Sequence, residues 1–273
     1  MMSPRQILQR YRTRKLKQAS SLLDSQLCRN GDFWLFVLGV NNSGTTLITK
    51  LLEAHPGIRS LPAEGQLLTD AFPRPDKLGV ERLWTSRMDL FRWTEDHDMA
   101  PVVQAKRDWL MYYPDRPGIL LEKSPPNTLR SRWLQQHFQP SRFIVITRHP
   151  YAVCEGIRRR MQYKVERAAM HWRDANTCLL DDMASLECVL MIRYEDLVTK
   201  PADSLGLVEA FLGLEGGHLL ESTKTVEAHS LEGSTSGLTD LNASSLERLS
   251  RQDVDVINDI CGPLMNRMGY EYH

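Results

Sequence analysis

The sequence predicts an α/β protein in which helices flank both faces of a central parallel sheet. Short apolar runs rich in branched residues, each of a length that suits a buried strand, occur at four places: 33–40, 119–121, 143–147 and 189–192. Segments with helical periodicity separate the runs, and strands that alternate with helices along a chain are typical of parallel sheets. With 273 residues, the chain is long enough to bury a large core in one domain.

Helical patterns are expected in four segments: 127–138, 150–160, 201–212 and 246–268, the last ending against Gly269. The region 213–245 is loop-like. Small residues cluster within it at 230–237, which indicates a mobile loop, either a plain linker or a flap over a site.

The stretch 75–117 interrupts the alternation of strands and helices. It contains Trp84, Trp93 and Trp109 among many charged residues. This composition predicts a helical insertion, and we expect the insertion to act as a cap that faces the substrate.

The N-terminal thirty residues differ from the rest of the chain. Six basic residues precede the first acidic residue, Asp24, and apolar residues lie among them at helical spacing. A transit peptide or a membrane-surface helix has such a composition. A basic helix exposed to solvent explains it as well and is favoured, because no apolar segment or cleavage-like site follows. We therefore expect residues 1–30 to form a basic helical arm and residues 31–273 to form a single domain.

The charge of the chain is balanced. Lys and Arg together number 34, Asp and Glu together also number 34, and the formal net charge is zero. A protein whose whole surface binds nucleic acid carries a broad basic excess, so no nucleic-acid partner is expected. Any site for a polyanion must be local.

Cysteine and histidine give no sign of cross-links or metal. The five cysteines are odd in number and widely spaced without a CxxC pair, and the eight histidines fall in no metal-ligand pattern. We therefore expect no metal and a reducing, cytoplasmic compartment. No run approaches the roughly 20 apolar residues of a membrane span, so no transmembrane segment is expected.

The strongest motif directly follows the first apolar run. Residues 39–46 read Gly-Val-Asn-Asn-Ser-Gly-Thr-Thr and open a helix. Backbone N–H groups at such a turn point toward an anion, and the helix dipole favours negative charge there. The glycine spacing is that of a P-loop, with Thr45 in the place of the lysine and Thr46 in the Ser/Thr place. This spacing predicts a three-layer P-loop-like fold that binds phosphate at the turn; a purely structural turn is the alternative.

A nucleotide hydrolase or kinase also needs an acid at a neighbouring strand end to hold magnesium. The later strands of this chain end instead in the pairs Glu122-Lys123, Arg148-His149 and Arg193-Tyr194. The loop is therefore better suited to a single 5′-phosphate held without metal.

A second motif is basic. The run 143–147 delivers Arg148 to the carboxyl end of its strand, which is where ligands bind in open parallel sheets. Three arginines follow at 158–160, and Arg160 shares a helix face with Gly156. Arginines around one point suit a second phosphate group. For at least one of the three, an exposed helix face is the better interpretation.

These motifs resemble the sulfotransferases that use 3′-phosphoadenosine 5′-phosphosulfate (PAPS). Ser43-Gly44-Thr45-Thr46 is similar to their 5′-phosphosulfate loop, and Arg148-His149-Pro150 with Arg160 is similar to their 3′-phosphate-binding strand and helix. Further segments resemble the family at Leu121-Glu122-Lys123-Ser124-Pro125, at Arg193-Tyr194-Glu195-Asp196-Leu197-Val198 and, in the style of tyrosylprotein sulfotransferases and their bacterial relatives, at Pro263-Leu264-Met265 and Met268-Gly269-Tyr270. The motifs follow the family order over most of the chain.

The resemblance implies a binding site for PAPS as co-substrate. The 5′-phosphosulfate would be held by Asn41, Asn42, Ser43, Gly44, Thr45 and Thr46. The remainder of the nucleotide would be met by Arg148, Gly156, Arg160 and Tyr194, although Tyr194 can equally be a packing residue.

The resemblance also implies catalytic roles. Lys123 would stabilise negative charge at the bridging oxygen, and Glu64 would act as the general base, as a similarly placed glutamate does in tyrosylprotein sulfotransferases. Glu64 is expected in the first turn of a helix that Pro62 starts, where the helix dipole alone also favours a glutamate. Cytosolic small-molecule sulfotransferases use a histidine instead, and His137 is the nearest candidate for that role.

Two positions depart from the family pattern. Asn42 stands where Lys or Arg usually precedes Ser-Gly-Thr-Thr, and an amide carries no charge, so either Lys123 supplies the cation or catalysis is weak. Gly156 stands where a serine usually binds the 3′-phosphate; a lost hydroxyl costs about 1–3 kcal/mol of binding, which arginines nearby could offset.

The sequence thus predicts a sulfotransferase that moves the sulfo group from PAPS to an acceptor hydroxyl or amine by in-line displacement. A P-loop kinase or nucleotide hydrolase is one alternative, and a nucleotide-binding module that has lost catalysis is another. The acceptor can be a peptide, glycan, lipid or small metabolite, and the sequence does not indicate the oligomeric state.

Overall fold

The computed structural model describes residues 18, 20–22, 24, 25, 27, 28, 31–113, 118–224, 227–230, 233–236 and 238–273, and describes 227–230 and 233–236 by their backbone. Most of the expected N-terminal arm, and part of the cluster of small residues at 230–237, therefore lie outside the described residues.

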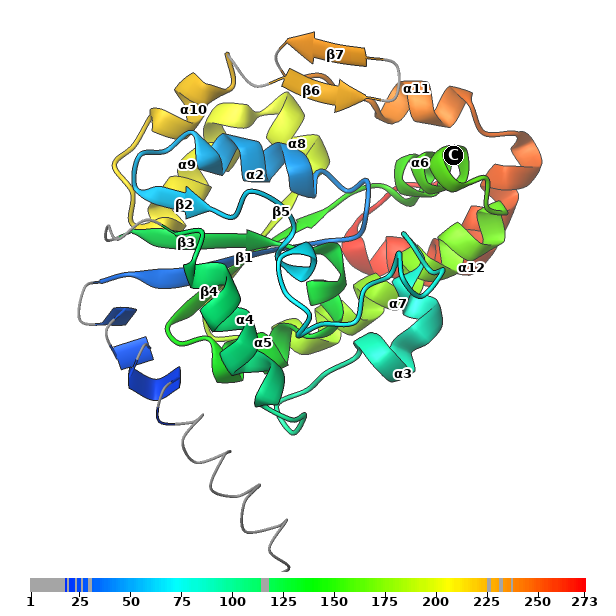
Figure 1. Ribbon diagram of the computed structural model, residues 1–273. Helices are drawn as coiled ribbons and strands as arrows, with labels where there is room; N and C mark the ends of the chain where they lie inside the picture. The colour runs from blue at the N-terminus through cyan, green and yellow to red at the C-terminus, as the bar shows by residue number, and fades with distance from the viewer. Residues whose placement is uncertain are drawn as a thin grey trace, which may run out of the picture.

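Five parallel strands form the central sheet in the spatial order β2-β3-β1-β4-β5 (Figure 1). The strands are β1 (Phe33–Leu38), β2 (Ile58–Ser60), β3 (Ile119–Lys123), β4 (Ser141–Thr147) and β5 (Val189–Arg193). Val37 of β1 pairs with Lys123 of β3, and Thr147 of β4 pairs with Arg193 of β5. The register therefore brings the carboxyl ends of these strands to one edge of the sheet.

Helices cover both faces of this sheet. Successive side chains of a strand point to opposite faces, and the alternate residues of β1 enter two separate cores accordingly. One face packs against α2 (Thr45–Glu53), α8 (Tyr194–Thr199), α9 (Pro201–Leu212) and α10 (His218–Ser222). The other face packs against α4 (Ala100–Leu110), α5 (Ser131–His137) and α7 (Val165–Met183). The expected three-layer α/β fold is confirmed.

A third group of helices stands beyond the carboxyl ends of the strands (Figure 1). It comprises α6 (Pro150–Met161), α11 (Asn242–Glu247) and α12 (Arg251–Met268), which pack with α7 around their own apolar cluster. The last helix begins five residues later than the sequence pattern suggests, because Ser250 and Asp253 form a capping box, and it ends at Gly269 as expected.

Some segments differ from the sequence expectations. The edge strand β2 has only three residues and gives no distinct apolar run. The segment 127–138 divides into a 3-10 helix, η3 (Pro125–Leu129), and α5, and the region 213–245 contains α10, the hairpin of β6 (Glu227–Ser230) and β7 (Gly233–Ser236), and α11.

The insertion at 75–117 contains η2 (Trp84–Arg87), α3 (Met88–Phe91) and α4, and its tryptophans are not exposed. Trp84, Trp93 and Trp109 are all buried, at 1%, 6% and 0% exposure. The apolar rings pack into the cores because burying them is strongly favourable. The three tryptophans that suggested a cap therefore hold the described part of the insertion against the rest of the domain.

The end of the N-terminal arm contacts α4. Lys106 is buried and donates to Ser20 Oγ at 2.8 Å and to Asp24 Oδ1 at 2.5 Å. Among the described residues, no helix is both long and apolar enough to span a bilayer.

Candidate active site

The carboxyl ends of the strands open into a pocket with a cavity volume of about 370 Å³. Every site residue expected from the sequence lines this pocket except Ser43. Its charged lining residues are the cations Lys50, Arg82, Lys123, Arg148, Arg159, Arg160 and Arg248 and the carboxylates Glu64 and Glu155. A chain of zero net charge therefore concentrates positive charge at one place, which favours an anionic ligand.

The glycine loop forms one wall of the pocket and leads into α2. Gly44 has a left-handed backbone with φ 101, and a Cβ on it would lie 2.8 Å from the ring of Tyr194. Gly39 is equally constrained, since a Cβ there would lie 2.5 Å from the carbonyl oxygen of Ile146. These close approaches explain why the loop needs glycine at both positions.

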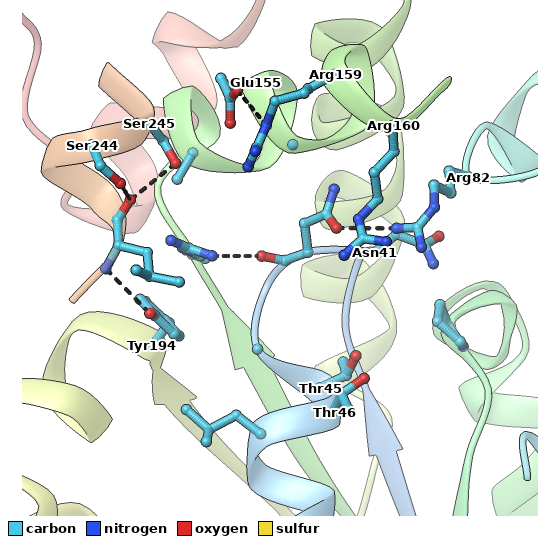
Figure 2. A pocket seen from close by; sticks show the side chains of 18 of the residues that line it. Asn41, Thr45, Thr46, Arg82, Glu155, Arg159, Arg160, Tyr194, Ser244 and Ser245 are labelled. Carbon is cyan, nitrogen blue, oxygen red and sulfur yellow. Dashed lines mark hydrogen bonds and ion pairs between the residues drawn. The ribbon is translucent and has the colours of Figure 1, made fainter. Parts of the chain in front are cut away.

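The loop residues take different roles. Thr45 and Thr46 lie at the first turn of α2 and face the pocket (Figure 2). Ser43 is 1% exposed, and its hydroxyl donates to the carbonyl oxygen of Val40 at 2.7 Å. The Ser43 side chain thus points inward and closes the turn, contrary to its expected place in the pocket.

Asn41 and Asn42 are held by residues of the insertion. Trp84 Nε1 donates to Asn41 Oδ1 at 2.9 Å, and Arg82 Nη1 donates to Asn42 Oδ1 at 3.0 Å. The insertion therefore contributes to the pocket after all, through one buried indole and one guanidinium.

Arg148 reaches the pocket from the end of β4. It donates to the backbone carbonyl of Asn42 at 3.0 Å and to Asn242 Oδ1 at 2.7 Å, and its guanidinium lies 3.9 Å from the centre of the Tyr194 ring. Burial lowers the pKa of Arg148, and the neighbouring Tyr194 and Glu195 raise it. Its Nη2 atom is buried and has no hydrogen-bond partner among the described residues.

Tyr194 lines the pocket and packs against the loop. It is 4% exposed, covers Gly44, and its hydroxyl donates to the carbonyl oxygen of Thr239 at 2.9 Å. The ring thereby orients Arg148 beside the loop.

The three arginines at the end of α6 point in different directions. Arg158 turns toward the turn between α11 and α12, where it donates to the carbonyl oxygen of Arg248 at 2.9 Å. Arg159 lines the pocket and pairs with Glu155 at 2.9 Å. Arg160 is exposed, lines the pocket on the same side as Gly156 and faces Arg82 (Figure 2). Arg158 does not line the pocket, but it is partly buried and bonded, so it does not form the exposed helix face that the sequence suggested.

Glu64 and Lys123 come from different segments and meet in the pocket. Lys123 Nζ, at the end of β3, donates to Glu64 Oε1 at 2.8 Å, and Gln66 Nε2 donates to Glu64 Oε2 at 2.8 Å. Glu64 does not stand in the first turn of an α-helix, as expected, but caps the three-residue 3-10 helix η1 (Gly65–Leu67). So short a helix has little dipole, which weakens the purely structural explanation for a glutamate here.

Glu122 fixes the segment that carries Glu64. It is fully buried, and its carboxylate accepts from the backbone N–H of Gly65 at 2.9 Å and from the hydroxyl of Ser124 at 2.5 Å, as well as from the amide of Asn127. Burial is the main cause that raises the pKa of Glu122, to about 7; its hydrogen bonds oppose this rise.

We expect Glu122→Gln to remove a pH dependence of stability. The pKa of Glu122 is about 7 in the folded chain and about 4.5 in the unfolded chain. The unfolded chain therefore loses its proton first as pH rises, so stability falls between about pH 4.5 and pH 7, by about 3 kcal/mol in all. Urea unfolding at pH 4.5 and pH 7.5 would measure this change. The prediction is contradicted if the variant and the wild type lose equal stability.

Several pocket residues escaped the sequence analysis. Ser244 and Ser245 reach the pocket from α11 (Figure 2). Arg248 reaches it from the turn after α11 and pairs with Glu155 at 3.0 Å. Ser244 and Ser245 lie in the region expected to be loop, Arg248 lies in the segment expected to be a helix, and none of the three belongs to a motif. His137, the alternative base, lines a separate depression with Ser20 on the side of the N-terminal arm.

Comparison with known proteins identifies the family. A family profile described as "Sulfotransferase family" matches residues 35–217, which is more than half of the chain. The chain therefore belongs to the sulfotransferase family, and it is an enzyme that transfers sulfo groups.

Two curated relatives are protein-tyrosine sulfotransferases. Protein-tyrosine sulfotransferase 2 of Gallus gallus is 25% identical over 268 residues, covering 87% of this chain and 69% of the relative. Protein-tyrosine sulfotransferase 1 of Danio rerio is also 25% identical, covering 88% of this chain and 72% of the relative. The resemblance to tyrosylprotein sulfotransferases is thus confirmed.

Solved structures agree on the fold. The sulfotransferase domain from the Synechococcus PCC 7002 olefin synthase superposes with a TM-score of 0.59 at 21% identity, covering 89% of this chain and 96% of that domain. A sulfotransferase domain from the curacin biosynthetic pathway gives 0.55 at 20% identity, covering 88% of this chain and 98% of that domain.

Proposed function

We propose that the chain transfers the sulfo group of PAPS to an acceptor hydroxyl or amine, with Glu64 as general base. The observation that carries this proposal is the meeting of Glu64 and Lys123, 2.8 Å apart, in the same pocket as the loop 41–46. A base, a cation and an anion-binding turn are the parts that an in-line transfer requires.

The lining of the pocket supports a donor with two anionic groups. One cluster of polar groups, the loop and the start of α2, suits a 5′-phosphosulfate. A second cluster, Arg148 with Arg160 across Gly156, suits a 3′-phosphate. The buried Arg148 Nη2 has no partner among the described residues, so it could donate a hydrogen bond to a bound anion.

The chain would do little covalent chemistry of its own. PAPS, once bound, supplies a sulfo group on a bisphosphate leaving group. The acceptor oxygen or nitrogen bonds to sulfur as the sulfur–bridging-oxygen bond breaks, the electron pair stays on the bisphosphate, and Glu64 takes the acceptor proton. Lys123 must leave Glu64 during this step and turn to the leaving oxygen, where its charge is most useful.

Particular residues bear on each of the two rival functions. Glu122, the acid next to a strand end, is fully buried and engaged by Gly65, Ser124 and Asn127, so it does not face the pocket as a magnesium ligand. Asn42 and Gly156 motivate the other rival, a nucleotide-binding module without catalysis.

The test is a transfer assay with labelled PAPS and a cell extract, followed by identification of the molecule that gains the sulfo group. Labelled product supports the proposal. Turnover of ATP that depends on magnesium, without response to PAPS, would favour a kinase or hydrolase. Tight binding of adenosine 3′,5′-bisphosphate without transfer to any acceptor would favour the module.

Adjacent arginines provide a matched binding test. We expect Arg160→Gln to weaken the affinity for adenosine 3′,5′-bisphosphate about 10- to 100-fold, because a charge-assisted hydrogen bond is worth about 1.5–3 kcal/mol. Arg158→Gln removes the same charge one residue away, where the side chain contacts Arg248 and Asp253 instead. It should leave the affinity unchanged by calorimetry; equal losses in both variants would argue against a 3′-phosphate site on this face.

The proposal also includes the class of acceptor and the compartment. Peptides, glycans, lipids and small metabolites remain the candidate acceptors. All five cysteines are free thiols, which supports our proposal of a reducing, cytoplasmic compartment.

A further inference from the structure

The phosphate loop carries an amide, not a cation, directly before Ser43. Asn42 has a left-handed backbone with φ 68, a conformation that asparagine tolerates well. Its side-chain oxygen accepts a hydrogen bond from Arg82 Nη1 at 3.0 Å. A guanidinium from the insertion thus stands beside the loop position that lacks a charge of its own.

Arg82 is built into the pocket wall and is not a free surface side chain. It is half-buried, lines the pocket, and has a left-handed backbone with φ 60, which is uncommon for a residue with a long side chain. Asn42 is its hydrogen-bond acceptor, and Arg82 forms no ion pair with any carboxylate that the structure describes.

The electrostatic surroundings of Arg82 are those of an anion site. Burial lowers its pKa, the facing Arg160 lowers it further, and Glu81 and Glu64 raise it. Figure 2 shows Arg82 and Arg160 directed toward one another at the side of the pocket near the loop. Two guanidinium groups that face each other repel, and an anion bound beside each of them relieves this repulsion.

Gly156 makes this arrangement possible. A Cβ on Gly156 would lie 2.8 Å from Asn42 Nδ2 and 3.1 Å from Asn42 Cγ. A side chain there would therefore require the Asn42 amide, which accepts from Arg82, to move. The two departures from the family pattern, at Asn42 and Gly156, are therefore one structural feature.

We propose that Arg82 binds the sulfonate end of the donor and replaces the missing cation of the loop, with Asn42 as its positioning residue and Gly156 as the space that Asn42 needs. This inference rests on the proposed function, because it assumes PAPS as the donor. The positive charges that act on the transferring group then come from two segments: Lys123 from β3 and Arg82 from the insertion.

The test compares the affinities of the full chain for PAPS and for adenosine 3′,5′-bisphosphate, which lacks the sulfonate, by calorimetry. Arg82→Met should weaken PAPS binding at least about 10-fold and bisphosphate binding much less. Arg87→Met is the control: Arg87 lies on the same segment but pairs with Asp89 outside the pocket. Thermal unfolding of each variant establishes that it is folded.

Relocating the charge separates a binding role from a merely structural one. In the Arg82→Met background, Asn42→Lys should restore PAPS affinity to within about threefold of the wild type, because it returns a cation to the loop. Asn42→Asp is a second, nearly isosteric variant; its carboxylate would pair with Arg82, and PAPS binding should weaken as in Arg82→Met.

The outcomes are distinct. If the wild type binds neither nucleotide, the proposed function fails and this inference fails with it. If the wild type binds both, but Arg82→Met weakens them equally and Asn42→Lys restores nothing, Arg82 is only structural and the inference alone is wrong. Unchanged PAPS affinity in a folded Arg82→Met chain would also overturn it.

Discussion

Glu64→Gln is expected to lower the rate of PAPS-dependent transfer roughly 10³-fold, because a positioned general base contributes about 10²–10⁴ to such a rate. The new side-chain amide at position 64 can still accept a hydrogen bond from Lys123 through its oxygen, so the geometry of the segment around residue 64 should persist. Affinity for adenosine 3′,5′-bisphosphate should therefore change less than about twofold. The rate is measured as transfer to the acceptor found in the labelling assay, and the affinity by calorimetry.

Glu81→Gln is the matched control for this variant. Glu81 is an exposed carboxylate next to the pocket-lining Arg82, but it does not itself line the pocket. The same change of charge there should leave the transfer rate within about twofold of the wild type. If Glu64→Gln keeps its turnover, the proton goes elsewhere and the assignment of the base is wrong.

Much of the fold was predictable because the three inner strands of this sheet, β1, β3 and β4, are largely buried on both faces. Such strands read as continuous apolar runs, and each of the four expected runs is a strand of the sheet. The strand β2 was not predictable, since its three residues, Ile58–Ser60, include two polar side chains and owe their conformation to pairing with β3. Local sequence carries little information about such an edge strand.

The pocket was predictable where a residue immediately follows a strand or opens a helix. Lys123, Arg148 and Tyr194 stand directly at strand ends, and parallel strands bring these positions together. Ser43 shows the limit of motif reasoning, because its hydroxyl turns away from the pocket to Val40.

No motif marks the pocket residues that were missed. Arg82 depends on the burial of Trp84, which fixes the insertion against Asn41. Arg248 and Ser245 depend on how α11 packs on α6. In each case the position is set by contacts far apart in sequence, so no local spacing predicts it.

Lys123→Met is the second variant with a large expected effect. Removing one preorganised charge or donor that acts on the transition state costs about 10²–10³ in rate, so transfer should fall by roughly that factor. Bisphosphate binding should fall much less, because Arg148 and Arg160 still line the other part of the pocket. Single-turnover transfer and calorimetry on the same protein would measure the two effects.

Two further variants decide whether the charge of Lys123 is what matters. Lys77→Met removes an exposed lysine whose nearest carboxylate, Asp70, is 3.8 Å away, and it should have no effect on either readout. Lys123→Arg keeps the charge but changes its geometry, so its rate should lie between those of the wild type and Lys123→Met. Equal rates for Lys123→Arg and Lys123→Met would mean that a positive charge at this position does not by itself support transfer. Full activity in Lys123→Met would leave Arg82 as the cation that acts on the leaving group, and the proposed division of charge between β3 and the insertion would have to be abandoned.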